Sequence, residues 1–289
     1  MSNELGTPVL DELKICYSAE PELLNMLQQI DYGKSQDFGD FAFRRTTSQH
    51  FQYAFDVICV CSSGAQRTAS ARFGRYGEIG SSYLFFRVEN YVLYDADLLA
   101  ASLRIPEQLG MTFHNFTSLD IAIDTRFDVA HLMKRIWHRP DITTIVNGKA
   151  IRDRKEVISS LSLVYSTTLE RVKSLTVYIK QRKASHDKTK GVTVAAYNKM
   201  NEIENVSHKE YIREFYGCPK RLYRLEVHLN NAEISDYCRS IGRAQEEQMV
   251  FDSGFLKEAF FYHLSSVIRY TKGRQKIAWD DIIRCNGRI

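Results

Sequence analysis

Two stretches of alternating sequence decide the fold: residues 116–124, FTSLDIAID, and residues 221–230, RLYRLEVHLN. Every second residue is apolar over most of each stretch. Because side chains alternate across a β-strand, each stretch predicts a strand with one apolar and one polar face. Each also ends in a polar turn and leads into a helix-like segment. Aligning the two places Asp120 beside Glu226. Either chance or an internal repeat accounts for this match, and a repeat predicts two similar α+β halves.

Strand-like segments continue on both sides of these two stretches. Aromatic and β-branched residues predict strands at 41–45, 51–61, 83–88, 159–166, 172–180 and 191–199. The polar pair Glu89-Asn90 stands between two apolar runs, 83–88 and 91–94, so it predicts the turn of a hairpin.

Helices are fewer and unevenly spaced. Apolar residues at helical spacing predict helices over 127–137 and 255–268, the second capped by Asp252 or Ser253. His263 falls on the apolar face of this second helix and is predicted to be a core histidine. Many strands with few helices favour an α+β fold, in which a largely antiparallel sheet carries helices on one side.

Composition is that of an ordinary globular protein, with 44% apolar and 26% charged residues. No apolar run approaches the ~18–20 residues that a membrane span needs, and the N-terminus lacks the build of a signal peptide. We therefore expect a cytoplasmic protein with no membrane partner. Residues 1–40 hold eight acids against two lysines, a net charge of −6 in a chain of +4. We interpret 1–40 as an acidic N-terminal extension and 41–289 as one domain.

Positive charge is densest between residues 171 and 190, where seven basic residues face one acid. Local positive fields attract polyanions, because each neutralised phosphate releases counterions. A solvated cationic surface is the alternative, and nucleic acid is the favoured partner. The residues predicted to contact DNA are Arg171, Lys173, Lys180, Arg182, Lys183, Lys188 and Lys190.

The polar faces of the two deciding strands carry candidate metal ligands. Asp120 and Asp124 share one face of the first strand, and Arg224, Glu226 and His228 share one face of the second. Carboxylates one strand repeat apart repel unless they are solvated or hold a cation. Carboxylates together with an imidazole suit Mg²⁺ or Mn²⁺. Either strand by itself is more simply explained as half-exposed, and only the two together favour a metal site.

Tyr197 is the candidate nucleophile. Small residues, Ala195 and Ala196, precede it and leave room for a ligand to approach. A phenol has a reference pKa of ~10 and is a weak nucleophile near neutral pH. It therefore needs a nearby base or cation and an electrophile polarised by a metal. Lys199, two residues later, is a candidate source of positive charge.

The order of these motifs resembles the Rep_trans family of rolling-circle replication initiators, known from staphylococcal-type plasmids with relatives in filamentous phages and conjugative elements. The resemblance runs over about residues 80 to 240, through LDIAID, a basic strand-loop-strand, AYNKMNE and YRLEVHL. Three features depart from the family pattern. The small G-S-x-x-S element expected upstream is absent, and KQRKASHDK, residues 180–188, occupies its place. Ser118 stands in place of an arginine, and Ala195-Ala196 stand where a basic residue often precedes the tyrosine.

The resemblance implies an enzyme that nicks one origin strand, forming a 5′-phosphotyrosine and leaving a 3′-hydroxyl. It implies Tyr197 as nucleophile, Asp120 and Glu226 as metal ligands, and roles for residues matching the family's further acids and arginine, namely Asp124, Glu202 and Arg224. His228 as ligand or base follows from strand alternation and not from the family. The departures leave Tyr178, Tyr211 and Tyr223 as alternative nucleophiles.

No G-x-x-x-x-G-K-[ST] motif is present, so we expect a host helicase or supercoiling to separate the strands and a host polymerase to extend the 3′-hydroxyl. The expected substrate is origin DNA, double-stranded and locally single-stranded, and a homodimer is plausible. A relaxase for conjugative transfer would use the same chemistry. The alternatives from other classes are a non-catalytic origin- or operator-binding protein on the same scaffold, and a structural partner protein.

Overall fold

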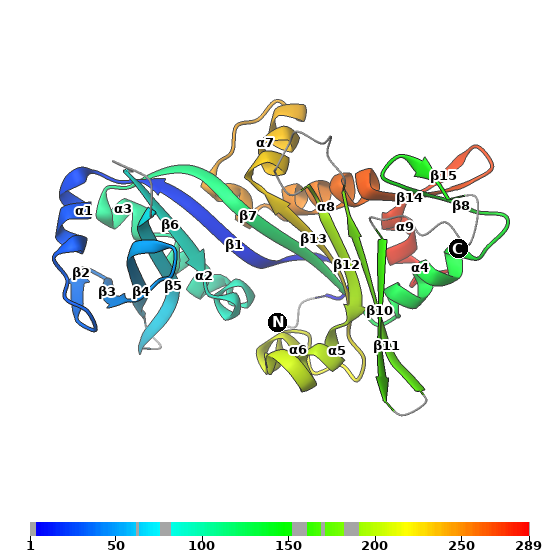
Figure 1. Ribbon diagram of the computed structural model, residues 1–289, viewed down its shortest axis with the longest axis horizontal. Coiled ribbons are helices and arrows are strands. Elements are labelled where there is room, and N and C mark those ends of the chain that lie inside the picture. The colour runs from blue at the N-terminus through cyan, green and yellow to red at the C-terminus, as the bar shows by residue number, and fades with distance from the viewer. Residues whose placement is uncertain are drawn as a thin grey trace. The chain divides into compact units, whose positions relative to one another are not determined.

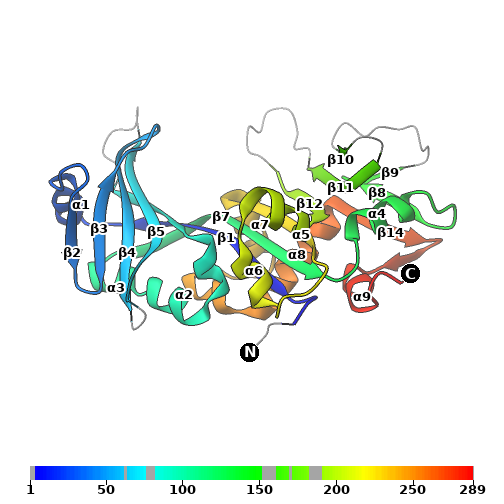
Figure 2. The same cartoon turned by 90° about the horizontal axis from the view of Figure 1, so that it is seen from below.

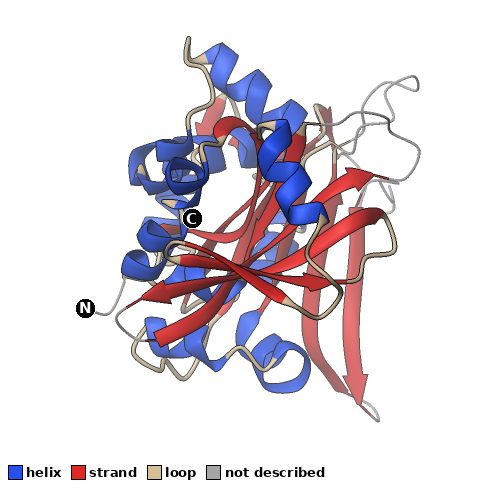
Figure 3. Ribbon diagram, turned by 90° about the vertical axis from the view of Figure 1, so that its left-hand side faces the viewer, coloured by secondary structure: helices blue, strands red, loops and turns tan. Residues whose placement is uncertain are grey.

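The computed structural model describes residues 4–61, 64–75, 82–151, 161–168, 171–181 and 191–288. The chain divides into two compact units. Unit 1 comprises Met1–Leu10, Asp120–Gly242 and Gln248–Ile289, and unit 2 comprises Asp11–Leu119 and Arg243–Glu247. Helices and strands both occur along the described chain (Figure 3), and the strand pairs with an assigned register are antiparallel. The predicted α+β class is confirmed.

Unit 2 is built on an antiparallel sheet with the order β1-β6-β5-β4-β3-β2. Figure 2 shows β2, β3, β4 and β5 side by side. Its core is aromatic, because the rings of Phe43, Phe55 and Phe73 pack on one another. The strands are β1 (Pro8–Ser18), β2 (Ser35–Phe38), β3 (Phe41–Thr46), β4 (Phe51–Cys61), β5 (Gly64–Arg75) and β6 (Tyr83–Val88), and the helices are α1 (Pro21–Gln28), the 3₁₀ helix η1 (Asn90–Tyr94), α2 (Ala96–Ser102) and α3 (Ile105–Leu109).

Unit 1 holds the two stretches that were expected to decide the fold. They form the end of β7 (Thr112–Thr125) and β13 (Tyr223–Asn230), which are neighbours in the order β10-β11-β12-β13-β7 (Figure 1). The two similar strands therefore lie in one sheet of one unit. The other strands of this sheet are β10 (Leu161–Thr168), β11 (Arg171–Lys180) and β12 (Thr193–Asn198).

The remaining elements of unit 1 are helices and a small sheet of order β15-β14-β8-β9. This sheet comprises β8 (Thr143–Val146), β9 (Lys149–Ala150), β14 (Ile268–Lys272) and β15 (Gln275–Ile277). The helices are α4 (Val129–Trp137), α5 (Lys199–Glu202), a π-helical turn η2 (Ile203–Ser207), α6 (Glu210–Phe215), α7 (Asn231–Ser240), the 3₁₀ helix η3 (Glu247–Phe251), α8 (Ser253–Val267) and α9 (Trp279–Arg284).

One face of the larger sheet of unit 1 is covered by helices. Both α4 and α8 pack against β12 and β13. The residues facing the helices are apolar and buried, among them Val194, Leu225 and Val227. Asp252 caps α8, because its Oδ1 accepts a hydrogen bond from the Phe255 amide at 3.0 Å. This confirms the predicted helix and its cap, and it leaves the opposite face of these strands for polar side chains.

Two predictions differ from the structure. Residues 90–94 form the helix η1 and not the second strand of a hairpin, because η1 is held against β1: the Tyr94 hydroxyl donates to Asp11 Oδ1 at 2.6 Å. Residues 1–40 were predicted to form a separate extension. The described part of this segment instead supplies β1, which pairs with β6, and β2, which pairs with β3. Unit boundaries accordingly fall inside β1 and β7 and not at residue 40.

A buried ion pair joins β7 to β13. Arg224 donates from Nε to Asp124 Oδ1 at 2.8 Å and from Nη2 to Asp124 Oδ2 at 2.6 Å, and both side chains are 0% exposed. Further along, His228 contacts Asp120. Residue numbers rise along β13 as they fall along β7, which is the alignment of antiparallel neighbours. The pair therefore fixes which residues of the two strands face each other.

We expect Arg224→Met to lower the free energy of unfolding by about 3–5 kcal/mol, because Asp124 would remain buried without its cation. Urea denaturation measures the change. The matched control is Arg221→Met, since Arg221 is exposed two residues before β13 and should change stability by less than about 0.5 kcal/mol. Asp124→Leu combined with Arg224→Met should recover much of the loss. Equal stability of the Arg224 and Arg221 variants would contradict this account of the pair.

His263 is a core residue, as predicted. It lies in α8 at 4% exposure and contacts the rings of Tyr237 and Tyr262. Burial lowers the pKa of this imidazole to about 4 from 6.5. The folded protein therefore holds His263 neutral under conditions in which the unfolded chain would bind a proton there.

This shift predicts a loss of stability on acidification. The unfolded state binds the additional proton once the pH falls below about 6.5, so stability should decline between about pH 6.5 and pH 4. His263→Phe should flatten this decline in denaturation curves recorded over that pH range. His50→Phe changes an exposed histidine and serves as the control. An unchanged pH dependence in His263→Phe would show that other groups cause the acid sensitivity.

Candidate active site

The polar face of unit 1 is set by the pairing of β12 with β13. Tyr197 lies opposite Arg224, Ala195 opposite Glu226, and Thr193 opposite His228. Side chains of paired residues point to the same face of a sheet. This is the face away from Val194 and Leu225, which are buried on the helix side. The two strands thus bring a phenol, a carboxylate and an imidazole to one surface.

Tyr197 and Glu226 are in direct contact. The Tyr197 hydroxyl donates a hydrogen bond to Glu226 Oε2 at 2.9 Å, and both residues are half-buried. They occupy diagonal positions on the paired strands, within reach of a long side chain. The residue directly opposite Glu226 is Ala195, whose methyl group leaves space beside the carboxylate. A nucleophile and a proton acceptor are therefore already within hydrogen-bonding distance.

Lys199 adds positive charge next to the phenol. It begins α5, directly after Asn198, which caps the helix by accepting from the Asn201 amide at 3.0 Å. Because the chain turns into the helix at this point, the Lys199 side chain lies over the Tyr197 ring, with its Nζ 5.7 Å from the ring centre. The ammonium is 2% exposed and lies 2.9 Å from Glu202 Oε2. A buried cation here favours negative charge on a nearby oxygen.

Asp120 and His228 form the third part of the face. His228 Nδ1 contacts Asp120 Oδ1, which leaves the imidazole oriented by a carboxylate. Glu226 lies one strand repeat from His228 on the same face of β13. Two carboxylates and one imidazole are suitable donors for Mg²⁺ or Mn²⁺, and carboxylate-oriented histidines are common at metal centres. Asp120 and His228 therefore fit the predicted cation, because their ligand atoms lie within 4.8 Å of each other, whereas among the described residues Glu226 does not belong to that group.

Three predicted site residues have other surroundings. Asp124 and Arg224, predicted as a metal ligand and a catalytic group, bind each other in the buried ion pair, so neither reaches the surface. Glu202, predicted as a ligand, lies beside Lys199. Strand alternation placed Arg224 on the correct face. Strand alternation could not show that Arg224 and Asp124 are buried on this face.

Of the alternative nucleophiles, Tyr178 is exposed on β11, on the face shared with Tyr197. Burial raises the pKa of the Tyr223 phenol, with Asp128 acting in the same direction, so Tyr223 is a poorer nucleophile. Tyr211 lies within α6. Of the four tyrosines, Tyr197 is the one with a hydrogen bond to a strand carboxylate in the described structure.

The predicted DNA-contacting residues are described only in part. Lys180 is exposed at the end of β11. The side chains of Arg171 and Lys173, and residues Arg182, Lys183, Lys188 and Lys190, lie outside the described residues.

Unit 2 carries a further set of basic residues that the sequence did not point out. Register places Lys14, Arg87 and Ser70 in a row across β1, β6 and β5, with Arg72 one strand repeat along β5 from Ser70. Arg44 on β3 lies opposite Asp56 of β4, which in turn lies opposite Ser70. We call Lys14, Arg44, Arg67, Arg72 and Arg87 the basic sheet face.

Several members of the basic sheet face have ion-pair partners. Arg44 and Arg67 both bind Asp56, at 2.5 and 3.0 Å, and Arg87 binds Glu12 at 3.0 Å. Arg44, Arg67 and Arg87 remain about half exposed at the side chain, so they can still meet a polyanion. The members of the basic sheet face are spread over four strands, β1, β3, β5 and β6. No local run of charge marks them, and strand pairing was needed to find them.

Comparison with known proteins adds nothing to these observations, because no protein-family model, curated protein or solved structure matches the chain. Among the helices of the described residues, none has the length and apolar character required to cross a membrane.

Proposed function

We propose that this chain is a metal-dependent DNA nicking-closing enzyme that initiates rolling-circle replication, with Tyr197 as the attacking residue. The observation that carries the proposal is the hydrogen bond from the Tyr197 hydroxyl to Glu226, with the Lys199 ammonium beside the same ring. A nucleophile paired with a base and with a nearby cation is the arrangement that covalent catalysis by a weak nucleophile needs.

The proposed step exchanges one ester bond for another. The Tyr197 oxygen forms a bond to the scissile phosphorus as the bond from phosphorus to the 3′-oxygen breaks. Glu226 takes the phenolic proton, and the departing 3′-oxygen gains a proton by way of Glu226 or solvent. The products are a 5′-phosphotyrosine and a free 3′-hydroxyl. The step replaces one phosphodiester bond with another of similar energy. The 3′-hydroxyl can therefore attack the phosphotyrosine, reverse the step and close the strand.

Asp120 and His228, whose ligand atoms lie within reach of one ion, would hold the divalent cation, Mg²⁺ or Mn²⁺, and we propose Glu226, one strand repeat from His228, as its further ligand. When bound, such a cation polarises a phosphate oxygen and offsets the charge that builds up during phosphoryl transfer. The chain's own contribution is to orient the donors. Asp120 holds the His228 ring, and the pairing of β12 with β13 sets Glu226 between His228 and the Tyr197 hydroxyl.

The basic sheet face and Lys180 supply positive charge for binding origin DNA, through phosphate contacts that carry no sequence information. We propose origin DNA, double-stranded and locally single-stranded, as the substrate, with host helicase and polymerase acting on the products and with a homodimer as the assembly. Transfer of a conjugative element would use the same site and the same step.

Tyr197→Phe should abolish the covalent protein–DNA adduct while DNA binding is unchanged, because only the hydroxyl is removed. The assay combines supercoiled plasmid with Mn²⁺ or Mg²⁺ and detects protein attached to the nicked strand, and mass spectrometry names the linked residue. Tyr178→Phe is the matched control, since Tyr178 is exposed on the neighbouring strand. A full yield of adduct from Tyr197→Phe would exclude this tyrosine. A gel shift without any nick in the unaltered protein would favour the non-catalytic DNA-binding alternative.

Glu226→Gln should reduce the nicking rate by about 10²–10⁴-fold, because the amide accepts no proton and is a poor ligand for a divalent cation. It should also reduce the rise in melting temperature that Mn²⁺ produces. Glu204→Gln makes the same chemical change at an exposed position of η2 and should leave both readouts unaltered. Normal nicking by Glu226→Gln would show that Glu226 is neither base nor ligand.

A further inference from the structure

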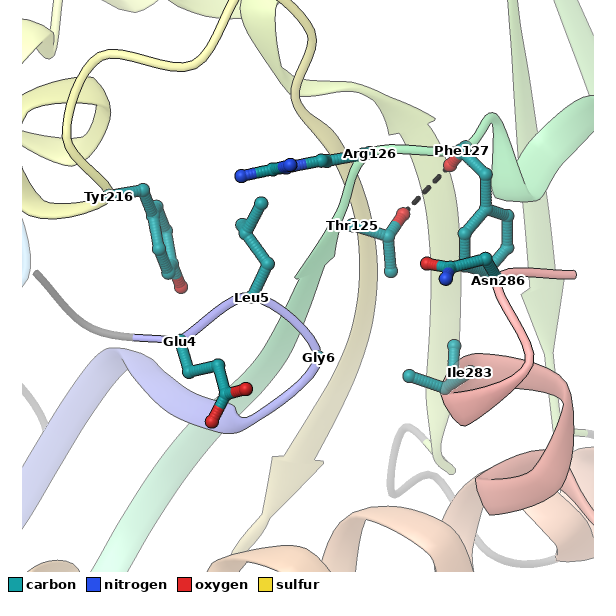
Figure 4. A pocket seen from close by; sticks show the side chains of 9 residues that line it. All are labelled: Glu4, Leu5, Gly6, Thr125, Arg126, Phe127, Tyr216, Ile283 and Asn286. Carbon is teal, nitrogen blue, oxygen red and sulfur yellow. Dashed lines mark hydrogen bonds between the residues drawn. The ribbon is translucent and has the colours of Figure 1, made fainter.

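A cavity of unit 1 lies where β7 ends. It has a volume of about 640 Å³ and is lined by Glu4, Leu5, Gly6, Thr125, Arg126, Phe127, Tyr216, Ile283 and Asn286 (Figure 4). These residues come from four places in the sequence: the segment before β1, the end of β7, the end of α6 and the end of α9. The proposed nicking step uses none of them.

The walls of this cavity are fixed by local contacts. The Gly6 amide donates to the Asp124 carbonyl at 2.9 Å, and the Thr125 hydroxyl donates to the Phe127 carbonyl at 2.8 Å. The Phe127 ring packs so closely against Gly287 that a Cβ there would lie 3.0 Å from it. Tyr216 is buried to 7% exposure. The two aromatic walls are therefore held in place before any ligand arrives.

The chemistry of the lining is mixed. In Figure 4 the Arg126 side chain extends toward Tyr216, while Phe127 and Asn286 lie on the other side of the cavity. Arg126 is exposed, and within the part of the chain that the structure describes it has no ion-pair partner. Glu4 adds one carboxylate. The cavity thus offers a cation, two aromatic rings, an amide and a hydrogen-bond acceptor.

This set of groups fits a nucleotide. Unpaired bases stack on aromatic side chains and on the plane of an arginine, and they use amides and carboxylates to bind the polar edge of the base. A guanidinium also binds phosphate through two parallel hydrogen bonds. Glu4 would repel a phosphate, so the phosphate belongs at Arg126 and an N–H group of the base at Glu4. The volume lies within the range of small-ligand pockets, about 300–1,000 Å³.

The cavity also lies at the same edge of the sheet as the candidate nucleophile. The Thr125 hydroxyl lies 3.5 Å from the Tyr223 carbonyl, and Tyr223 pairs with Asn198, the residue after Tyr197. The ends of β7, β13 and β12 are therefore aligned. Because neighbouring strands are about 4.8 Å apart, two strand spacings, roughly 10 Å, separate the end of β7 from the end of β12.

We propose that this cavity binds one unpaired base of the DNA strand that Tyr197 attacks, with the base packed against one of its two aromatic walls, Phe127 or Tyr216, and an adjoining phosphate on Arg126. The proposal rests on the proposed function for the identity of the ligand. It adds a specific contact that holds the single strand in register at the sheet edge. Free nucleotides share the chemistry of the ligand, and the experiment separates the two sources.

Photocrosslinking tests the contact directly. The full chain is mixed with a short single-stranded oligothymidylate that carries one 4-thiothymidine, irradiated, and digested for mass spectrometry. We expect crosslinks in the peptides containing Phe127 or Tyr216, and unmodified oligothymidylate should compete. Arg126→Gln should reduce the yield about tenfold, in line with the loss of one stacking or phosphate contact. Arg221→Gln removes another exposed arginine and should have no effect.

Further variants make the outcomes distinct. Tyr216→Phe retains the ring and should retain the crosslink. Loss of the crosslink in that folded variant would contradict stacking. Crosslinks only outside the cavity, or an unchanged yield in Arg126→Gln, would overturn the proposal. The proposal would also be overturned if free 4-thiothymidine monophosphate labelled the cavity as strongly as the oligonucleotide and DNA did not displace it. Tyr197→Phe should crosslink normally. In the unaltered protein, a crosslink without any covalent nicking would reject the proposed function alone. Nicking without the crosslink would reject the cavity alone.

Discussion

Asp124 and Arg224 are withdrawn completely from water, and this pair sets the alignment on which the rest of unit 1 depends. Removing two charges from solvent is expensive and is offset only when the geometry of the pair is good. Both hydrogen bonds form here, at 2.8 and 2.6 Å, in the two-pronged arrangement that arginine and carboxylate favour. A shift of β13 by one residue would break both bonds and turn every side chain of the strand to the other face. The same alignment brings His228 to Asp120 and, through β12, Tyr197 to Glu226.

Charge balance on the polar face explains where a metal ion would be useful. Asp124 is neutralised by Arg224, and Glu202 lies beside Lys199. The contacts of Asp120 and Glu226 are of a different kind, because an imidazole and a phenol can both be neutral. Under the proposed function, a divalent cation would bind at Asp120, near the oxygen that is proposed to attack.

Alternation along single strands was sufficient to predict the α+β class, the strands that carry the site, and the shared face of Glu226 and His228. It could not identify partners, because a pattern with a period of two says nothing about which strand lies alongside. For this reason the pattern alone predicts Asp124 and Arg224 as surface groups, although the pairing of β7 with β13 buries both. The same limit applies to η1, which depends on contacts with β1, and to the basic sheet face, whose members are spread over β1, β3, β5 and β6. Residues 1–40 looked like an extension because their net charge is acidic, although β1 itself carries Leu13, Ile15 and Tyr17 in the core.

The residues of the proposed site follow one another along the strands, from the outer edge of the sheet inward. Tyr197 lies one residue from the end of β12, opposite Arg224, and its hydroxyl reaches inward to Glu226. His228 and its partner Asp120 lie one further strand repeat inside, about 6.6 Å beyond Glu226 at ~3.3 Å per residue. The cavity at the end of β7 lies at the outer edge. A strand of DNA entering from that edge would meet the base-binding cavity first, then the phenol, and then the cation ligands. Under the proposed function, this order would bring the scissile phosphate next to both Tyr197 and the cation ligands.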